Sequence, residues 1–138
     1  MQPVDRGVQM AKLLVADDEE LLRVCVTAIL SAAGHEVVEA KDGLEAFEKY
    51  QKMRDEIALI LMDIQMPRLN GIDATRMIKA VNPNAKVILM SGYADPIPDD
   101  IKHDGFIGKP FRASDLHSLV SKFLGGESPA PWEGLSLG

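Results

Sequence analysis

The sequence predicts a three-layer α/β sandwich built on a single parallel sheet. Five short apolar runs alternate with four segments of helical period along the 138 residues. Such alternation is typical of parallel strands joined by right-handed helical crossovers. With 46% of its residues apolar, the chain can bury the core of one domain but is too short for two.

The strand candidates are the apolar runs, and three of them (LLVA, IALILM and KVILM) contain almost no polar residue. Continuous apolar runs are expected where helices cover both faces of a strand. The predicted strands are Lys12 to Ala16, Glu36 to Ala40, Ile57 to Met62, Lys86 to Met90 and Gly105 to Gly108.

The helix candidates are segments in which apolar residues recur at helical spacing. They are Glu19 to Ala33, Gly43 to Met53, Ile72 to Val81 and Ser114 to Leu124. Ser114 is a suitable N-cap for the last of them. The single cysteine, Cys25, has no intramolecular disulfide partner and falls in register with Leu22 and Val26. We therefore expect a buried structural thiol.

The helix that should join the fourth and fifth strands is poorly supported by the sequence. Pro96 and Pro98 stand where this helix would begin, and proline is tolerated in a first helical turn but not beyond it. We expect a short or irregular element from Pro98 to His103. The predicted fold is thus a sandwich with a shortened fourth helix.

Composition and charge limit the domain organisation and the partners. We expect an N-terminal extension over residues 1–10, a folded domain over 11–125, and a flexible tail or linker rich in Gly, Pro and Ser over 126–138. No long apolar run or signal-type segment is visible, which predicts a cytoplasmic protein without a membrane partner. A formal net charge of -6 argues against direct nucleic-acid binding.

Polar residues follow the predicted strands at the edge where the working site of an open parallel sheet is expected. The first strand is followed by Asp17 and Asp18, the third by Asp63, the fourth by Ser91 and the fifth by Lys109. Taken singly, these residues have ordinary explanations as helix caps or turns. Their meeting at one edge favours a functional site.

Three carboxylates that converge on one edge repel each other unless a cation lies between them. Oxygen ligands of this kind predict Mg²⁺ or Mn²⁺ at Asp17, Asp18 and Asp63. A carboxylate can also attack phosphorus and form an aspartyl phosphate. A Lys109 ammonium and a Ser91 hydroxyl would then neutralise or bind the phosphoryl oxygens, and Gly92 would leave room for them. The three histidines show no metal-type spacing.

The segments LLVADDEE, LILMDIQMPRLNGIDATRMIK, ILMSGYAD and FIGKPF resemble the receiver domain of bacterial two-component response regulators, of the chemotaxis-Y-like type. The resemblance extends from about Ala11 to Gly125. It implies a flavodoxin-like (βα)₅ fold with strand order 2-1-3-4-5. It also implies transfer of a phosphoryl group from a histidine kinase or a histidine phosphotransfer domain, and a downstream protein target or fused output domain that the sequence does not identify.

The resemblance assigns roles by motif position. Asp63 corresponds to the phosphoacceptor, Asp17 and Asp18 to the acidic metal pair, and the Gln65 carbonyl to a main-chain metal ligand. Ser91 corresponds to the residue whose hydroxyl moves toward the phosphoryl group. Lys109 corresponds to the lysine that pairs with it, in a Lys-Pro peptide bond that is usually cis in the family.

Phe106 matches the aromatic switch residue that moves inward when the hydroxyl is recruited. Because Phe replaces the common Tyr, no phenolic hydroxyl is available in either state. The 18 positions from Ser91 to Lys109 are about one helical turn fewer than usual, so we expect no family-typical dimer face on the fourth helix. Gln65 and Tyr93 flank the phosphoryl site, and we expect Tyr93 to shield the acyl phosphate from water.

Three other classes of protein fit the sequence less well. An aspartate-nucleophile phosphatase typically has a second acid where this chain has Gln65. A flavodoxin-type cofactor binder would not place Asp17 and Asp18 beside a phosphate. An interaction module with a vestigial site would not keep every phosphoryl-site residue. The sequence therefore favours a phosphoacceptor domain over an enzyme that acts on free substrates.

Overall fold

The computed structural model describes residues 11–92 and 96–125. Its strands are β1 (Lys12–Ala16), β2 (Glu36–Ala40), β3 (Ile57–Asp63), β4 (Val87–Ser91) and β5 (Gly105–Gly108). Its helices are α1 (Glu20–Ala32), α2 (Gly43–Met53), α3 (Gly71–Val81) and α4 (Ala113–Leu124). Every predicted strand and helix is present, with ends that agree to within one residue.

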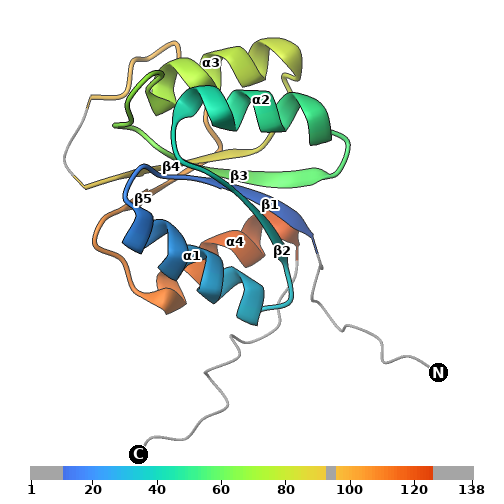
Figure 1. Ribbon diagram of the computed structural model, residues 1–138, viewed down its shortest axis with the longest axis vertical. Helices are drawn as coiled ribbons and strands as arrows, with labels where there is room; N and C mark the ends of the chain where they lie inside the picture. Colours follow the sequence, from blue (N-terminus) through green and yellow to red (C-terminus); the bar gives the residue numbers. More distant parts are fainter. Residues whose placement is uncertain (1–10, 93–95, 126–138) are drawn as a thin grey trace, which may run out of the picture.

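The five strands form one parallel sheet in the order β2-β1-β3-β4-β5. Helices α2 and α3 cover one face of the sheet, and α1 and α4 cover the other (Figure 1). This three-layer arrangement confirms the predicted fold class and strand order. Within the described part of the chain, no helix has the length and apolar character needed to cross a bilayer.

The central strands are buried because helices pack on both of their faces. Leu14, Ile60 and Leu89 point into the core beneath α2 and α3. Leu13 and Leu61, on alternate positions of the same strands, point into the core beneath α1 and α4. This two-sided burial explains why these strands read as continuous apolar runs, and it fixes the edge where their carboxyl ends meet.

The connection between β4 and β5 contains no helix over its described residues 96–104, which confirms the expected irregular element. Ile101 is buried, and its N–H donates to the Pro98 carbonyl at 3.0 Å. Asp100 forms a two-pronged ion pair with Arg76 of α3, at 3.2 and 3.1 Å. Side chains of α3 and one buried isoleucine thus hold this segment in place of a helix.

Two local predictions were wrong. Cys25 is exposed, because the buried stripe of α1 is centred on Val26 and Leu30 and Cys25 lies about 100° around the axis from Val26. Ser114 lies inside α4 and is not its N-cap. The helix starts two residues earlier than a Ser114 cap requires, with Arg112 at the N-cap and its N–H donating to the Asp115 carboxylate at 3.0 Å.

Candidate functional site

The predicted site residues meet at the carboxyl edge of the sheet. Asp63 and Ser91 are the last residues of β3 and β4, while Asp17 and Lys109 directly follow β1 and β5. Asp17, Asp63 and Ser91 are all buried. Because β1, β3, β4 and β5 are neighbours and parallel, their ends bring these side chains together, as the sequence predicted.

Lys109 is the centre of the charged contacts at this edge. Its Nζ lies 2.9 Å from Asp17 Oδ2 and 3.1 Å from Asp63 Oδ1. Glu19 Oε1 lies 3.6 Å from the same ammonium. The Lys109 backbone N–H donates to the Ser91 carbonyl at 2.7 Å, and the Lys109–Pro110 bond is cis, as the resemblance implied. One ammonium is therefore shared between two buried carboxylates.

Burial and like charge change the ionisation of these groups. Burial, followed by the charge of Asp17, raises the pKa of Asp63 to about 7, although Lys109 acts to lower it. Burial alone would lower the pKa of Lys109, but its contacts with Asp17 and Asp63 outweigh burial and raise it. The Asp63 carboxyl therefore ionises at a higher pH than an ordinary aspartate.

The three aspartates have the donor chemistry of a divalent-cation site. Carboxylate oxygens of Asp17, Asp18 and Asp63 lie within 4.8 Å of one another, and Asp18 is exposed. Gln65 is also exposed and lines, with Asp18, a cavity of about 780 Å³ that opens beside the site. Hard oxygen ligands beside an open cavity suit Mg²⁺, which usually keeps several of its waters, so these residues fit the predicted metal.

Gly92 and Phe106 are two further predicted site residues, and both have open space beside them. A Cβ added to Gly92 would lie 3.8 Å from the Lys109 Cβ, which is ordinary van der Waals contact. Gly92 thus leaves room beside Lys109 without being required by the fold. Phe106 is 44% exposed on β5, so the aromatic ring predicted to move inward points outward in this structure. Tyr93 lies outside the described residues, and its shielding role stays a prediction.

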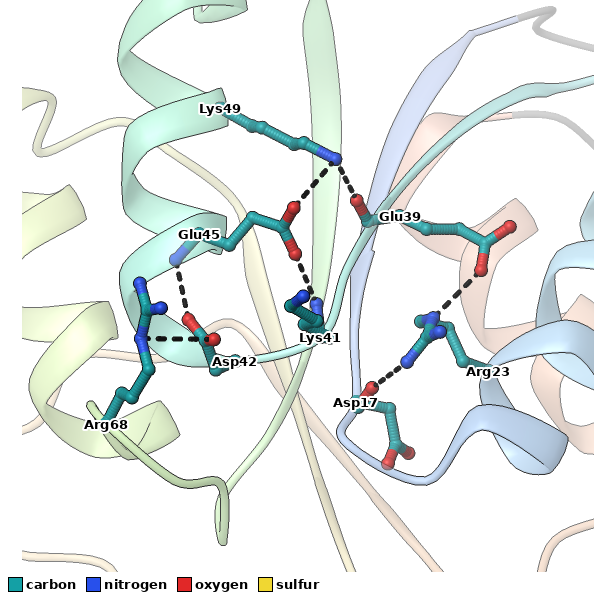
Figure 2. A network of polar contacts seen from close by, with 8 residues as sticks. All are labelled: Asp17, Arg23, Glu39, Lys41, Asp42, Glu45, Lys49 and Arg68. Carbon is teal, nitrogen blue, oxygen red and sulfur yellow. Dashed lines mark hydrogen bonds and ion pairs between the residues drawn. The ribbon is translucent and has the colours of Figure 1, made fainter.

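The sequence did not reveal a network of polar contacts behind the site (Figure 2). Arg23 of α1 donates to the Asp17 carbonyl and to the Glu39 carboxylate. Further along, Asp42 caps α2 by accepting the Glu45 N–H, and it pairs with Arg68 at 3.3 Å. The Asp42 cap is a local contact, but the Arg23–Glu39 and Asp42–Arg68 pairs join residues 16 or more positions apart, which no local pattern could have identified.

The profile of the family described as "Response regulator receiver domain" matches residues 13–121. Chemotaxis protein CheY of Thermotoga maritima is 39% identical over 116 residues, which cover 80% of this chain and 95% of that protein. Sporulation initiation phosphotransferase F of Bacillus subtilis is 28% identical over 119 residues, covering 82% of this chain and 93% of that protein.

Among solved structures, TrrA from Thermotoga maritima in complex with Mg²⁺ and BeF superposes with a TM-score of 0.76 at 29% identity. The match covers 83% of this chain and 99% of that one. The CheX–CheY–BeF3–Mg²⁺ complex from Borrelia burgdorferi gives a TM-score of 0.78 at 27% identity, covering 85% and 95%. Sequence, fold and site agree that this chain belongs to the response regulator receiver domain family, whose members act as phosphoacceptors in two-component signalling.

Proposed function

We propose that Asp63 is the phosphoacceptor of this domain. One Asp63 carboxylate oxygen attacks the phosphorus of a phosphohistidine, the P–N bond breaks, and the imidazole nitrogen keeps the electron pair. The observation that carries this proposal is the position of Lys109 Nζ, 3.1 Å from Asp63 Oδ1 and 2.9 Å from Asp17 Oδ2. A cation fixed beside the nucleophile can neutralise charge on the transferred phosphoryl oxygens.

The neighbouring side chains complete the site. We assign Asp17, Asp18, Asp63 and the Gln65 carbonyl to a bound Mg²⁺, with Mn²⁺ as the substitute of similar ligand preference. The metal, when bound, supplies positive charge to the phosphoryl oxygens. The support in this chain is the cluster of three carboxylates within 4.8 Å.

Ser91 and Phe106 form the readout of the phosphoryl group in this proposal. Ser91, buried at the end of β4, would donate its hydroxyl to a phosphoryl oxygen. Phe106, now 44% exposed, would pack inward as Ser91 moves, and this alters the surface offered to a target. The domain, taken as residues 11–125 between an N-terminal extension and a C-terminal tail or linker, would catalyse only its own phosphorylation and dephosphorylation.

Phosphorylation assays with a small donor test this proposal. Incubation with Mg²⁺ and acetyl phosphate should give one phosphoryl adduct by mass spectrometry, and Asp63→Asn should abolish it. Asp42→Asn is the matched control, because Asp42 is an equally buried aspartate whose cap to α2 an asparagine can keep. Repeated release of phosphate from varied monoesters would instead indicate a phosphatase.

We propose that the phosphohistidine donor docks over an apolar hollow of about 530 Å³ beside Lys109. Leu21 and Cys25 of α1 and Phe111 line this hollow, and Leu21 is 79% exposed. A helix of a histidine kinase or histidine phosphotransfer domain could cover these side chains while its histidine faces Asp63.

A charged side chain placed in this hollow should weaken docking of the donor protein without changing the chemistry at Asp63. Leu21→Glu should slow phosphotransfer from a phosphohistidine protein at least about tenfold, since a buried interface charge costs roughly 1.4 kcal/mol or more. The rate with acetyl phosphate should stay unchanged, because that donor needs no protein surface. Equal rates with the protein donor for wild type and Leu21→Glu would contradict this docking site.

A further inference from the structure

Arg23 is a largely buried cation outside the charged cluster itself. Its side chain is 15% exposed. NH1 donates to the Asp17 carbonyl oxygen at 2.7 Å, and Nε donates to Glu39 Oε1 at 2.9 Å (Figure 2). One guanidinium on α1 therefore ties the residue that follows β1 to the end of β2.

The contacts of Asp17 show what this tie restrains. Its N–H donates to the Ala40 carbonyl of β2 at 3.0 Å. Its Oδ1 accepts the Glu19 N–H at 2.9 Å, and its Oδ2 accepts from Lys109. The main-chain carbonyl is held by Arg23. With both main-chain groups and both carboxylate oxygens engaged, the Asp17 carboxylate has a fixed direction.

Glu39, which accepts a hydrogen bond from Arg23, is itself held by α2. The Glu39 carbonyl accepts a hydrogen bond from Lys49 of α2, and Lys49 also pairs with Glu45 at 3.3 Å. The end of β2 is thus fixed by α1 on one face of the sheet and by α2 on the other. Arg23 therefore connects the Asp17 main chain to a part of β2 that two helices hold in place.

We propose that Arg23 is a positioning residue for the divalent cation, which it serves by holding the Asp17 peptide so that the carboxylate faces Asp18 and Asp63. This inference rests on the proposed function of that cluster. The contact of Arg23 with Asp17 is to the main chain, so Arg23 acts through Asp17. Partners that orient a metal ligand in this indirect way commonly change metal affinity by about 10- to 100-fold when removed.

Electrostatics alone predicts the opposite effect. Arg23 is a positive charge close to a cation site, so neutralising it would strengthen Mg²⁺ binding through the loss of repulsion. Loss of positioning instead weakens binding, because the Asp17 carbonyl loses the hydrogen bond from Arg23 that restrains it. The sign of the change in Mg²⁺ affinity therefore distinguishes the two effects.

Isothermal titration calorimetry with Mg²⁺ measures this sign directly. Arg23→Gln should weaken Mg²⁺ binding about tenfold. Arg23→Lys keeps the charge but cannot span two acceptors, so it should weaken binding as well. Glu39→Ala, which removes the anchor of Arg23 and leaves its contact with Asp17, should cause a smaller loss. The last two variants carry the test if Arg23→Gln does not fold.

Lys12→Gln is the matched control. Lys12 is 18% exposed and forms ion pairs with Glu36 and Glu56 at the opposite end of β1. Its loss should lower stability, measured by urea unfolding, without changing Mg²⁺ affinity.

Unchanged or tighter Mg²⁺ binding by folded Arg23→Gln would overturn the inference, and so would equal weakening by Lys12→Gln. If wild type neither binds Mg²⁺ nor accepts phosphate from acetyl phosphate, the proposed function itself fails. If wild type does both and Arg23→Gln binds Mg²⁺ equally well, only the role of Arg23 is wrong.

Discussion

Asp63 lies in an environment that opposes its own charge. It is buried at the end of β3 with Asp17 and Asp18 close by, and Lys109 compensates only in part. A group held in this way is destabilising when ionised, and the destabilisation is relieved when a cation or a covalent phosphoryl group with its counter-charges occupies the site. The same residue is thus both the nucleophile and a source of strain in the metal-free domain.

Asp63→Asn should stabilise the metal-free domain at pH 8. The pKa of Asp63 is raised from 3.8 to about 7 in the folded state, so the folded state binds more protons than the unfolded state between these values. Stability contributed by the wild-type carboxyl is therefore lost as pH rises towards 7. The stability difference between Asp63→Asn and wild type should grow from pH 5 to pH 8.

Urea unfolding in EDTA at the two pH values measures this difference. Added Mg²⁺ should stabilise wild type at pH 8 by mass action and have a smaller effect on Asp63→Asn. A variant equal to wild type at both pH values would show that the surroundings of Asp63 are not strained.

At the scale of elements, the β4–β5 connection shows how single side chains can replace a helix. The Asp104 carboxylate accepts the Val87 N–H at 2.8 Å and pairs with Lys79 of α3 at 3.0 Å. Its own N–H donates to the Val87 carbonyl at 2.7 Å. Asp104 thereby joins the start of β5 to the start of β4 and to α3, across the segment that lacks a helix.

Asp104→Ala should destabilise the domain by about 1–3 kcal/mol at pH 7, because the Val87 N–H and the Lys79 ammonium lose their shared acceptor. Burial acts to raise the pKa of Asp104, but the hydrogen bonds from Val87 and Lys79 outweigh it and lower the pKa below 3.8. Its contribution is therefore complete above pH 3.8 and is lost as pH falls through the lowered value.

Urea unfolding at pH 7 and at pH 3 tests this, with a smaller difference from wild type expected at the acid pH. Asp99→Ala is the control, since Asp99 is an exposed aspartate of the same connection. Equal destabilisation by both substitutions would contradict the special role of Asp104.

The elements and most of the site were predictable because their signals are local. The central strands are continuously apolar since both faces are buried, and Asp63, Ser91 and Lys109 could be placed because strand ends share one edge. The exposure of Cys25 depends on how α1 is rotated about its axis. The contact from Arg23 to Glu39 depends on how α1 packs against β2. Neither of these features has a local sequence signal.

At the scale of the whole molecule, the absence of a helix over residues 96–104 leaves less surface for contact with a partner. Stable protein interfaces bury about 800 Å² on each partner, usually with a packed apolar centre. Between Pro98 and His103, Ile101 already packs in the domain's own core and Asp100 is paired with Arg76. This segment has little apolar area left for a second copy of the chain.

We therefore expect that activation does not create a dimer through Pro98 to His103. Lys102 is exposed in this segment, so a glutamate at this position would disrupt a dimer built on it. Sedimentation velocity with Mg²⁺ and beryllofluoride should instead show either a monomer or a dimer that Lys102→Glu leaves intact. Lys122→Glu, the same change at an exposed position of α4, controls for the altered net charge. A beryllofluoride-dependent dimer that Lys102→Glu dissociates and Lys122→Glu does not would show that this connection, despite lacking a helix, is an assembly surface.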